Sequence, residues 1–392
     1  MTQPARHILP VIVSAQFCCT SLWFAGNGVM GDLIAHFDLK PSALGHLTTA
    51  VQLGFIIGTL LFALFTITDR FSPSKVFLYS ALLGALCNLG ILWQGNGLTS
   101  ISGFRFLTGF FLAGIYPVGM KIAADHFDKG LNKSLSFLVG ALVLGTALPH
   151  LLKGILVALP WPWIVASTSA IAILGGILLI LWVPDGPYRK PGQALDFMAC
   201  FTVFRNKGFR AAAFGYFGHA WELYAFWTFV PVMLSTYAQT NPNIVFNVPL
   251  LSFATIAIGG LACVLGGFIS QKKGVSKTAR WALALSGLCC MVSPLFFVLP
   301  HPLAFVGFLL FWGMVVIADS PLFSTLVAQS APLEVKGTAL TMVNCIGFAI
   351  TIASLQVCTL WQSQIPFQYL FVILAPGPIF GWITTLKKKV KA

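Results

Sequence analysis

The chain has 392 residues, of which 57% are hydrophobic and only 8% carry a formal charge. Soluble domains carry charge on about 25% of their residues, so this composition excludes soluble globular proteins, disordered chains, disulfide scaffolds and coiled coils. The longest stretch without a charged side chain, residues 337–386, is far longer than one membrane helix requires. Lipid must therefore solvate most of this chain.

The uncharged stretches predict an all-α membrane protein. Backbone groups inside lipid must be bonded within their own segment, and a helix needs about 20 apolar residues to cross the bilayer. The short alternating segments of a membrane β-barrel are missing from the sequence. Turn signals separate twelve expected spans: 8–35, 42–68, 74–94, 100–126, 133–157, 162–183, 210–237, 249–270, 279–299, 303–329, 337–361 and 367–386.

The positions of the basic residues predict the orientation of these spans. If both termini are cytoplasmic, 19 of the 23 Lys and Arg residues lie on the cytoplasmic side. This asymmetry accounts for the net charge of +13, so we expect no nucleic-acid partner. The first apolar stretch is too long for a signal peptide, so it is interpreted as an uncleaved span. We expect a multi-pass protein of the cell (inner or plasma) membrane.

The longest inner connection divides the chain into two related parts. We expect a six-helix half over 1–184, a cytoplasmic linker over 185–209 and a second six-helix half over 210–392. Short basic turns follow both the second and the eighth span, about 201 residues apart. Two repeated six-helix halves related by pseudo-symmetry are a known plan of transporters.

The turn after the second span carries a recognisable motif. The pattern Gly-x-Leu-Ala-Asp-Arg-x-Gly-Arg-Arg/Lys is matched at Asp69 and Arg70, and Lys75 stands near its basic end, whereas Phe65 and Ser72 replace the glycines. With the six-plus-six arrangement, this turn resembles that of the major facilitator superfamily. The resemblance implies a secondary transporter that works by alternating access, with Asp69, Arg70 and Lys75 as a cytoplasmic gate. It makes Asp69 a latch that pairs across the halves or with the N-terminus of a neighbouring helix.

The fourth span adds a second similarity to that superfamily. Arg105 is followed by Gly109 and Gly114, as in the superfamily's fourth helix, but the Gly-Pro-x-x-Gly-Gly stretch of its drug exporters is missing from the fifth span. The resemblance implies that the first, fourth, seventh and tenth helices line a central cavity. The first span carries a polar stripe at helical spacing, which is either a wall of that cavity or a helix–helix contact: Gln16, Thr20, Trp23 and Asn27.

The seventh span carries the most informative residue. Glu222 lies 12 residues beyond Arg210, which at about 1.5 Å per residue places it near the bilayer midplane. An ionisable group there indicates function, because a desolvated carboxyl group can take up a proton and release it when the cavity opens. Alternatively, Glu222 is a structural residue bonded to His219, three residues earlier, or to Arg105. The neighbouring rings suit an organic substrate: Trp221, Tyr224 and Trp227.

Two further charged residues lie inside expected spans. Asp319 is followed by Pro321, which invites a bend that serves as a gate, or else Asp319 forms a salt bridge near the inner mouth. Arg105 pairs with Glu222, binds a substrate anion or modulates a carboxyl group. Near the inner end of the fourth span, Lys121 snorkels or pairs with an acidic neighbour. Two weaker candidates for the cavity are Tyr116 and Asn344.

The function expected from these residues is proton-coupled secondary transport of a small solute. A divalent-metal carrier using His219, Glu222 and Asp319, and an organic-anion carrier using Arg105, are alternatives of the same fold. A membrane enzyme is the least favoured class, because the sequence lacks a nucleophile with a base, a phosphate loop and a second His-x-x-Glu. We expect no enzyme activity, no cofactor and no metal site. The expected partners are the solute, protons and lipid, and the expected state is a monomer.

Overall fold

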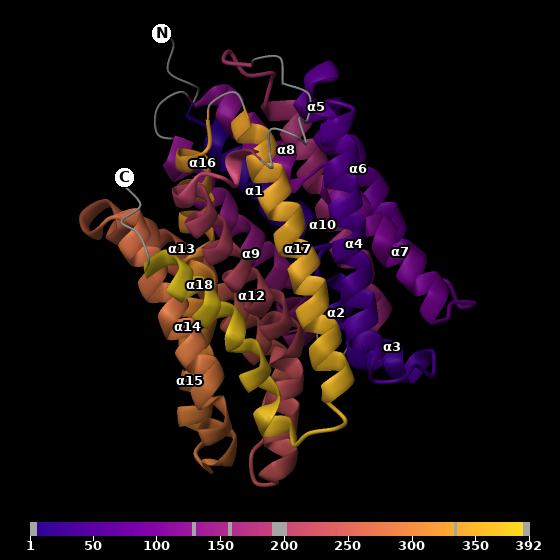
Figure 1. Ribbon diagram of the computed structural model, residues 1–392. Helices are drawn as coiled ribbons and strands as arrows, with labels where there is room; N and C mark the ends of the chain where they lie inside the picture. Colours follow the sequence, from indigo (N-terminus) through magenta and orange to yellow (C-terminus); the bar gives the residue numbers. More distant parts are fainter. Residues whose placement is uncertain (1–5, 128–130, 156–158, 190–201, 333–334, 387–392) are drawn as a thin grey trace. The chain divides into compact units, whose positions relative to one another are not determined.

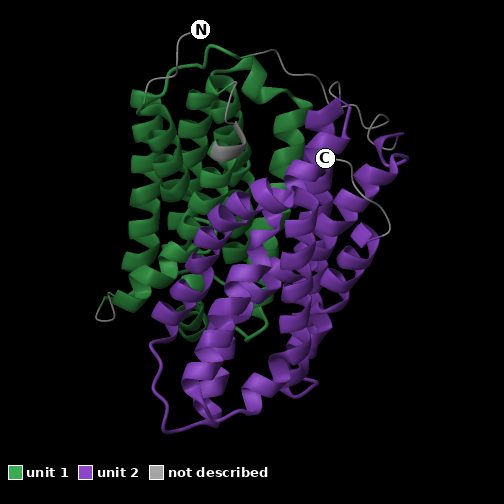
Figure 2. Ribbon diagram, turned by 90° about the vertical axis from the view of Figure 1, so that its left-hand side faces the viewer, with its two compact units in different colours: residues 1–195 green, residues 196–392 purple. Residues whose placement is uncertain are grey.

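A computed structural model describes residues 6–127, 131–155, 159–189, 202–332 and 335–386. These residues form helices and no strand, and they divide into two compact units, Met1–Leu195 and Asp196–Ala392 (Figures 1 and 2). The division falls within the expected linker. Among the described residues, ten helices are long and apolar enough to cross a membrane.

Unit 1 contains the first six spans. Its elements are α1 (Ile8–Thr20), α2 (Ala25–Gly28), α3 (Met30–His36), α4 (Ala43–Leu64), α5 (Ile67–Arg70), α6 (Pro73–Leu89), η1 (Gly90–Leu92), α7 (Leu98–Leu112), α8 (Tyr116–His126), α9 (Leu131–Ile155) and α10 (Trp161–Trp182). The helix α1 packs against α9 and α10, and α6 packs against α7 and α10.

Two helices of unit 1 are in backbone contact. They are α4 and α7, whose crossing is lined by Gly54, Gly58 and Gly109. A β-carbon at Gly54 would collide with the carbonyl oxygen of Phe106, and one at Gly109 would collide with that of Val51. Small residues of this kind let membrane helices approach closely, which maximises their van der Waals contact.

Unit 2 contains the last six spans. Its elements are α12 (Lys207–Thr240), α13 (Val248–Lys273), α14 (Val275–Val298), α15 (Pro302–Ala318), α16 (Ser320–Ser330), α17 (Lys336–Trp361), η3 (Phe367–Leu374) and α18 (Pro376–Leu386). The helix α12 packs against α16, α17 and α18. It is not among the ten apolar helices, because its polar side chains lower its hydropathy.

The starts of several helices follow from local sequence. The side chain of Asn206 accepts hydrogen bonds from the backbone N–H groups of Gly208 and Phe209, and Asn247 and His301 cap α13 and α15 in the same way. Proline occupies the first or second position of α6, α10, α13, α15 and α16, where its missing N–H costs no helical hydrogen bond.

Several expected spans are interrupted rather than continuous, which corrects the sequence prediction. The first breaks between Thr20 and Ala25, the fourth at 113–115, and the tenth at Asp319, while the twelfth begins as a 3₁₀ helix. Pro117, Pro321 and Pro376 each follow a break and cannot donate to the carbonyl four residues back. The break in the first span has no proline, and its cause lies in a contact described below.

Candidate functional site

Glu222 lies buried in unit 2 and is held by neutral donors alone. Its Oε1 accepts hydrogen bonds from the Trp312 indole N–H at 2.6 Å and the Cys290 thiol at 3.2 Å, and its Oε2 accepts one from the Ser286 hydroxyl. These donors come from α14 and α15. Within the described part of unit 2, no cation lies at ion-pair distance from this carboxyl group. The site thus satisfies the oxygens without compensating a negative charge.

The second buried carboxyl group of unit 2 is Asp319, whose partner is His219. The His219 Nδ1 and Asp319 Oδ1 atoms are 2.8 Å apart, and both side chains are almost fully buried. Asp319 stands in the break between α15 and α16, at the N-terminus of α16, where the helix dipole favours negative charge. The alternative in which His219 bonds to Glu222 is therefore wrong, because the partner of His219 is Asp319.

Arg105 is fully buried in unit 1, where it holds the break in the first span. Its Nη1 donates to the Leu22 carbonyl at 3.1 Å and to the Asn88 side-chain oxygen at 3.3 Å, and its Nη2 donates to the Trp23 carbonyl. An α-helix would bond those two carbonyls to amides four residues on. The guanidinium group donates to these carbonyls in place of the amides, which explains a helix break without proline.

Asn88 extends this contact to the sixth span. Its side-chain amide donates to the Val165 carbonyl and to the Thr168 and Ser169 hydroxyls of α10. Arg105 was expected to pair with Glu222, to bind a substrate anion or to modulate a carboxyl group. Its hydrogen bonds instead join α7, α6 and the break after α1, all within unit 1.

The polar stripe of the first span is divided by that break. Gln16 is buried in α1, and neither polar atom of its side chain has a hydrogen-bond partner among the described residues. The ring of Trp23 lies against Phe55, and Asn27, in α2, donates to the Thr48 hydroxyl at 2.8 Å. The expectation of one continuous helical face is therefore wrong, because Gln16 and Asn27 belong to different helices.

The remaining cavity candidates occupy several environments. Trp221 donates its indole N–H to the Ile373 carbonyl at 3.2 Å, so it packs toward η3. The buried rings of Tyr224 and Trp227 contact each other, with centroids 5.3 Å apart. Tyr116 begins α8, and Asn344 is half-buried on α17.

Comparison with known proteins decides what kind of molecule carries these residues. The family model described as Major Facilitator Superfamily matches residues 12–355. The chain belongs to the major facilitator superfamily. No curated protein matches it. It is therefore a multi-pass integral membrane protein and a secondary transporter of this superfamily.

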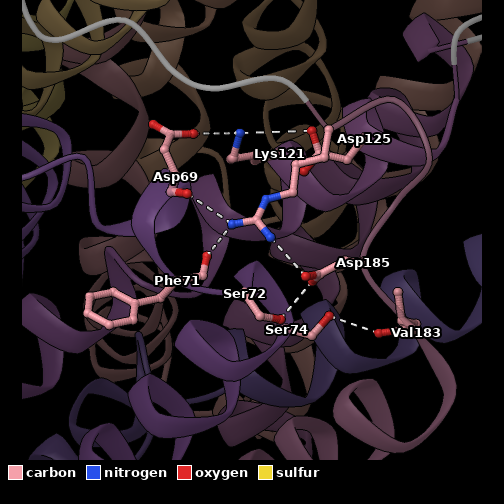
Figure 3. Close-up of polar contacts among 9 residues, drawn as sticks. Asp69, Phe71, Ser72, Ser74, Lys121, Asp125, Val183 and Asp185 are labelled. Carbon is pink, nitrogen blue, oxygen red and sulfur yellow. Dashed lines mark hydrogen bonds and ion pairs between the residues drawn. The ribbon is translucent and has the colours of Figure 1, made fainter.

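The superfamily motif after the second span forms an ion-pair cluster within unit 1. Asp69 is 2.9 Å from the Lys121 ammonium group, which also lies 3.8 Å from Asp125 (Figure 3). Arg70 donates to the Thr66 hydroxyl at 3.1 Å, and Lys75 is exposed. Asp69 was expected to pair across the halves or with a helix N-terminus, but its partner in the described structure is a lysine of the same unit.

Sequence reasoning missed several residues that contact the candidates, among them Ser286, Cys290 and Arg189. Ser286 and Cys290 are spaced four residues apart on α14, so they share one face, but nothing in the sequence relates that face to Glu222. Arg189 was counted only as a basic residue of the linker, although its side chain contacts the motif turn. Among the described residues, no group of three or more His, Cys, Asp or Glu side chains is arranged to hold a metal ion.

Proposed function

We propose that this protein is a proton-coupled transporter that moves a small organic solute by alternating access, with Glu222 as the coupling residue. One observation carries the proposal: among the described residues, a carboxyl group buried in the seventh span is bonded only to neutral donors. A buried charge without a counter-ion is costly in lipid. Binding a proton removes that cost, and exposure to water allows the proton to leave.

The surroundings of Glu222 suit both protonation states. A hydroxyl group both donates and accepts, so Ser286 donates to a carboxylate and accepts from a protonated carboxyl group. Its own hydrogen can then turn to a carbonyl one helical turn back, as serine commonly does in helices. Trp312 and Cys290 can keep donating to the other oxygen throughout. The site can therefore change its charge without leaving a polar atom unpaired.

The aromatic side chains around Glu222 favour an organic solute over a bare ion. The centroids of the Phe226 and Trp312 rings lie 4.5 Å apart beside the carboxyl group, and Tyr224 and Trp227 lie on α12 with Phe226. The Nη1 and Nη2 groups of Arg105 donate to carbonyls of its own unit, which does not favour an organic-anion carrier. For a metal carrier, the pairing of His219 with Asp319 draws the histidine away from Glu222.

A flux screen tests this proposal. Purified protein in liposomes is given labelled organic solutes with and without an imposed pH gradient. A carrier of the proposed kind shows saturable uptake, counterflow and accumulation that follows the gradient. Uptake that saturates but ignores the pH gradient would contradict proton coupling, and flux without saturation or counterflow would contradict a carrier.

We further propose that both termini face the cytoplasm, in the cell membrane, and that the protein acts as a monomer of two six-helix halves. The excess of Lys and Arg on one side supports this orientation. In whole cells, a cysteine placed by Lys389→Cys should resist a membrane-impermeant thiol reagent until the membrane is opened. A cysteine placed by Lys40→Cys, in a loop expected outside, should react at once. Labelling of the first variant in intact cells would overturn the topology.

Asp69→Asn should slow transport and leave the fold intact. The Asp69–Lys121 pair is partly exposed, and such pairs contribute about 0–1 kcal/mol to stability, so the unfolding temperature should hardly change. Turnover should fall because Lys121 loses the carboxylate with which it pairs at the motif turn. Asp38→Asn, an exposed acid elsewhere in unit 1, is the matched control. Wild-type turnover in Asp69→Asn would mean that Asp69 is merely a solvated turn residue.

A further inference from the structure

The chain that leaves the sixth span is docked on the turn between the second and third spans. Ser74 donates its hydroxyl to the Val183 carbonyl at 2.9 Å, and Ser72 donates to the Asp185 carboxylate at 2.7 Å (Figure 3). The backbone N–H of Tyr188 donates to the Asp125 carbonyl at the end of α8. The first residues of the expected linker are thus part of the packed structure of unit 1.

A glycine makes this docking possible. A β-carbon at Gly186 would collide with the backbone carbonyl of Asp125, so any other residue there would push the segment away from α8. The contact is consequently one of backbone against backbone, and it sets the path of the segment before Arg189.

Arg189 joins the docked segment to the motif turn. Its Nη2 donates to the carbonyls of Asp69 at 3.0 Å and Phe71 at 2.8 Å, and its Nη1 donates to the Asp185 carboxylate at 2.8 Å. Asp69 lies in α5, a single turn whose last carbonyls have no helical partner. A cation at the C-terminal end of a helix is electrostatically favourable, so the guanidinium group is suited to hold these carbonyls.

The turn held by Arg189 is strained at its start. Thr66, which precedes α5, has φ 48° and ψ 39° in the left-handed region, which a β-branched residue rarely adopts. The amides of Asp69 and Arg70 both donate to the Thr66 carbonyl, so the hydrogen bonds of the turn depend on this conformation. Such strain persists only where surrounding contacts enforce it.

We propose that Arg189 is a clasp that keeps the Thr66–Phe71 turn in its strained conformation, so that pulling the linker away from unit 1 releases the turn that carries Asp69. The linker would then act on the motif turn mechanically, through two carbonyl contacts, in addition to joining two parts of the chain. This device is independent of proton coupling at Glu222.

Hydrogen–deuterium exchange of the full-length protein in lipid nanodiscs tests the clasp without a known substrate. Arg189→Gln should speed exchange of the amides of Asp69, Arg70, Phe71 and Tyr188 by roughly tenfold or more, because hydrogen bonds to a charged group are stronger than neutral ones. Arg205→Gln, at an exposed arginine of unit 2, should leave them unchanged. Arg189→Lys keeps the charge without the forked geometry and should give intermediate rates.

A second substitution separates the clasp from ordinary packing. Glycine adopts the left-handed region without a steric penalty, so Thr66→Gly in the Arg189→Gln background should slow exchange of the turn back toward the wild-type rate. Tyr188 should stay fast in that double variant, because its own contact is not repaired. Unchanged exchange in Arg189→Gln would overturn the proposal. So would a turn that stays equally fast when Thr66→Gly is added.

Discussion

Glu222→Gln should abolish accumulation driven by a pH gradient while leaving exchange of solute for solute. Glutamine has nearly the same shape as glutamate, so its oxygen still accepts from Trp312 and Cys290, and its amide can donate to Ser286. It cannot bind and release a proton. Exchange does not require proton release, so the conformational cycle itself should survive.

The size of the effect follows from the driving force. One proton moved with one neutral solute supports up to about tenfold accumulation per unit of pH gradient, since a factor of ten corresponds to ~1.4 kcal/mol. In Glu222→Gln the ratio of inner to outer solute should fall to one, measured in proteoliposomes with a substrate from the flux screen. Normal accumulation would show that proton coupling does not pass through this residue, and Asp319 would be tested next.

An infrared measurement gives a check that needs no substrate. A carboxyl group that binds a proton gains a C=O stretching band, so pH-difference spectra of the purified protein should contain a band that is missing in Glu222→Gln. Asp319→Asn is the matched control, since it removes the other buried acid in the described part of unit 2, which is paired with His219. If the two variants lose the same single band, the assignment to Glu222 is wrong.

Arg105→Met should destabilise the protein strongly. Methionine fills part of the volume but leaves the Leu22 and Trp23 carbonyls and the Asn88 oxygen buried without their donor. Each unpaired buried polar group costs about 1–3 kcal/mol. Removing a buried charge recovers part of this free energy. The recovered part is small, because three acceptors already stabilise the guanidinium charge. We therefore expect a net loss on the order of 3 kcal/mol.

Thermal unfolding in detergent measures this loss. Arg105→Lys should be intermediate, because an ammonium group keeps the charge but not the fork that reaches several acceptors. Arg205→Met, at an exposed position, should be neutral. An unchanged unfolding temperature in Arg105→Met, combined with lost substrate binding, would instead identify Arg105 as part of an anion site.

The sequence predicted the spans well because hydropathy and turn chemistry are local. For example, the sixth span was expected over 162–183 and α10 extends from Trp161 to Trp182. The breaks at Pro117 and Pro321 also had local signals. The break before Ala25 had none, because the group that donates a hydrogen bond to the Leu22 carbonyl belongs to Arg105, 83 residues along the chain.

The candidate residues were predictable in kind but not in their partners. Counting helical rise places Glu222 near the bilayer midplane, and this depth stays a prediction. The structure shows that its side chain is buried within unit 2. Its donors come from α14 and α15, and no spacing within the seventh span reveals them. His219 illustrates the same limit: its i,i+3 spacing suggested a partner on its own helix, whereas its side chain reaches Asp319, in the break between α15 and α16. Tertiary contacts decided both pairings.

The glycine-lined crossing of α4 and α7 has a mechanical consequence. With backbone pressed against backbone at Gly54 and Gly109, neither helix can turn about its axis or slide along the other without a collision. The two helices should move together as a rigid body. Deformation of unit 1 during a transport cycle must then concentrate where side chains alone bridge the elements, as Asn27 does between α2 and α4. The distance between two labels placed on α4 and α7 should therefore stay constant during transport. The distance between a label on α4 and one on α3 should change.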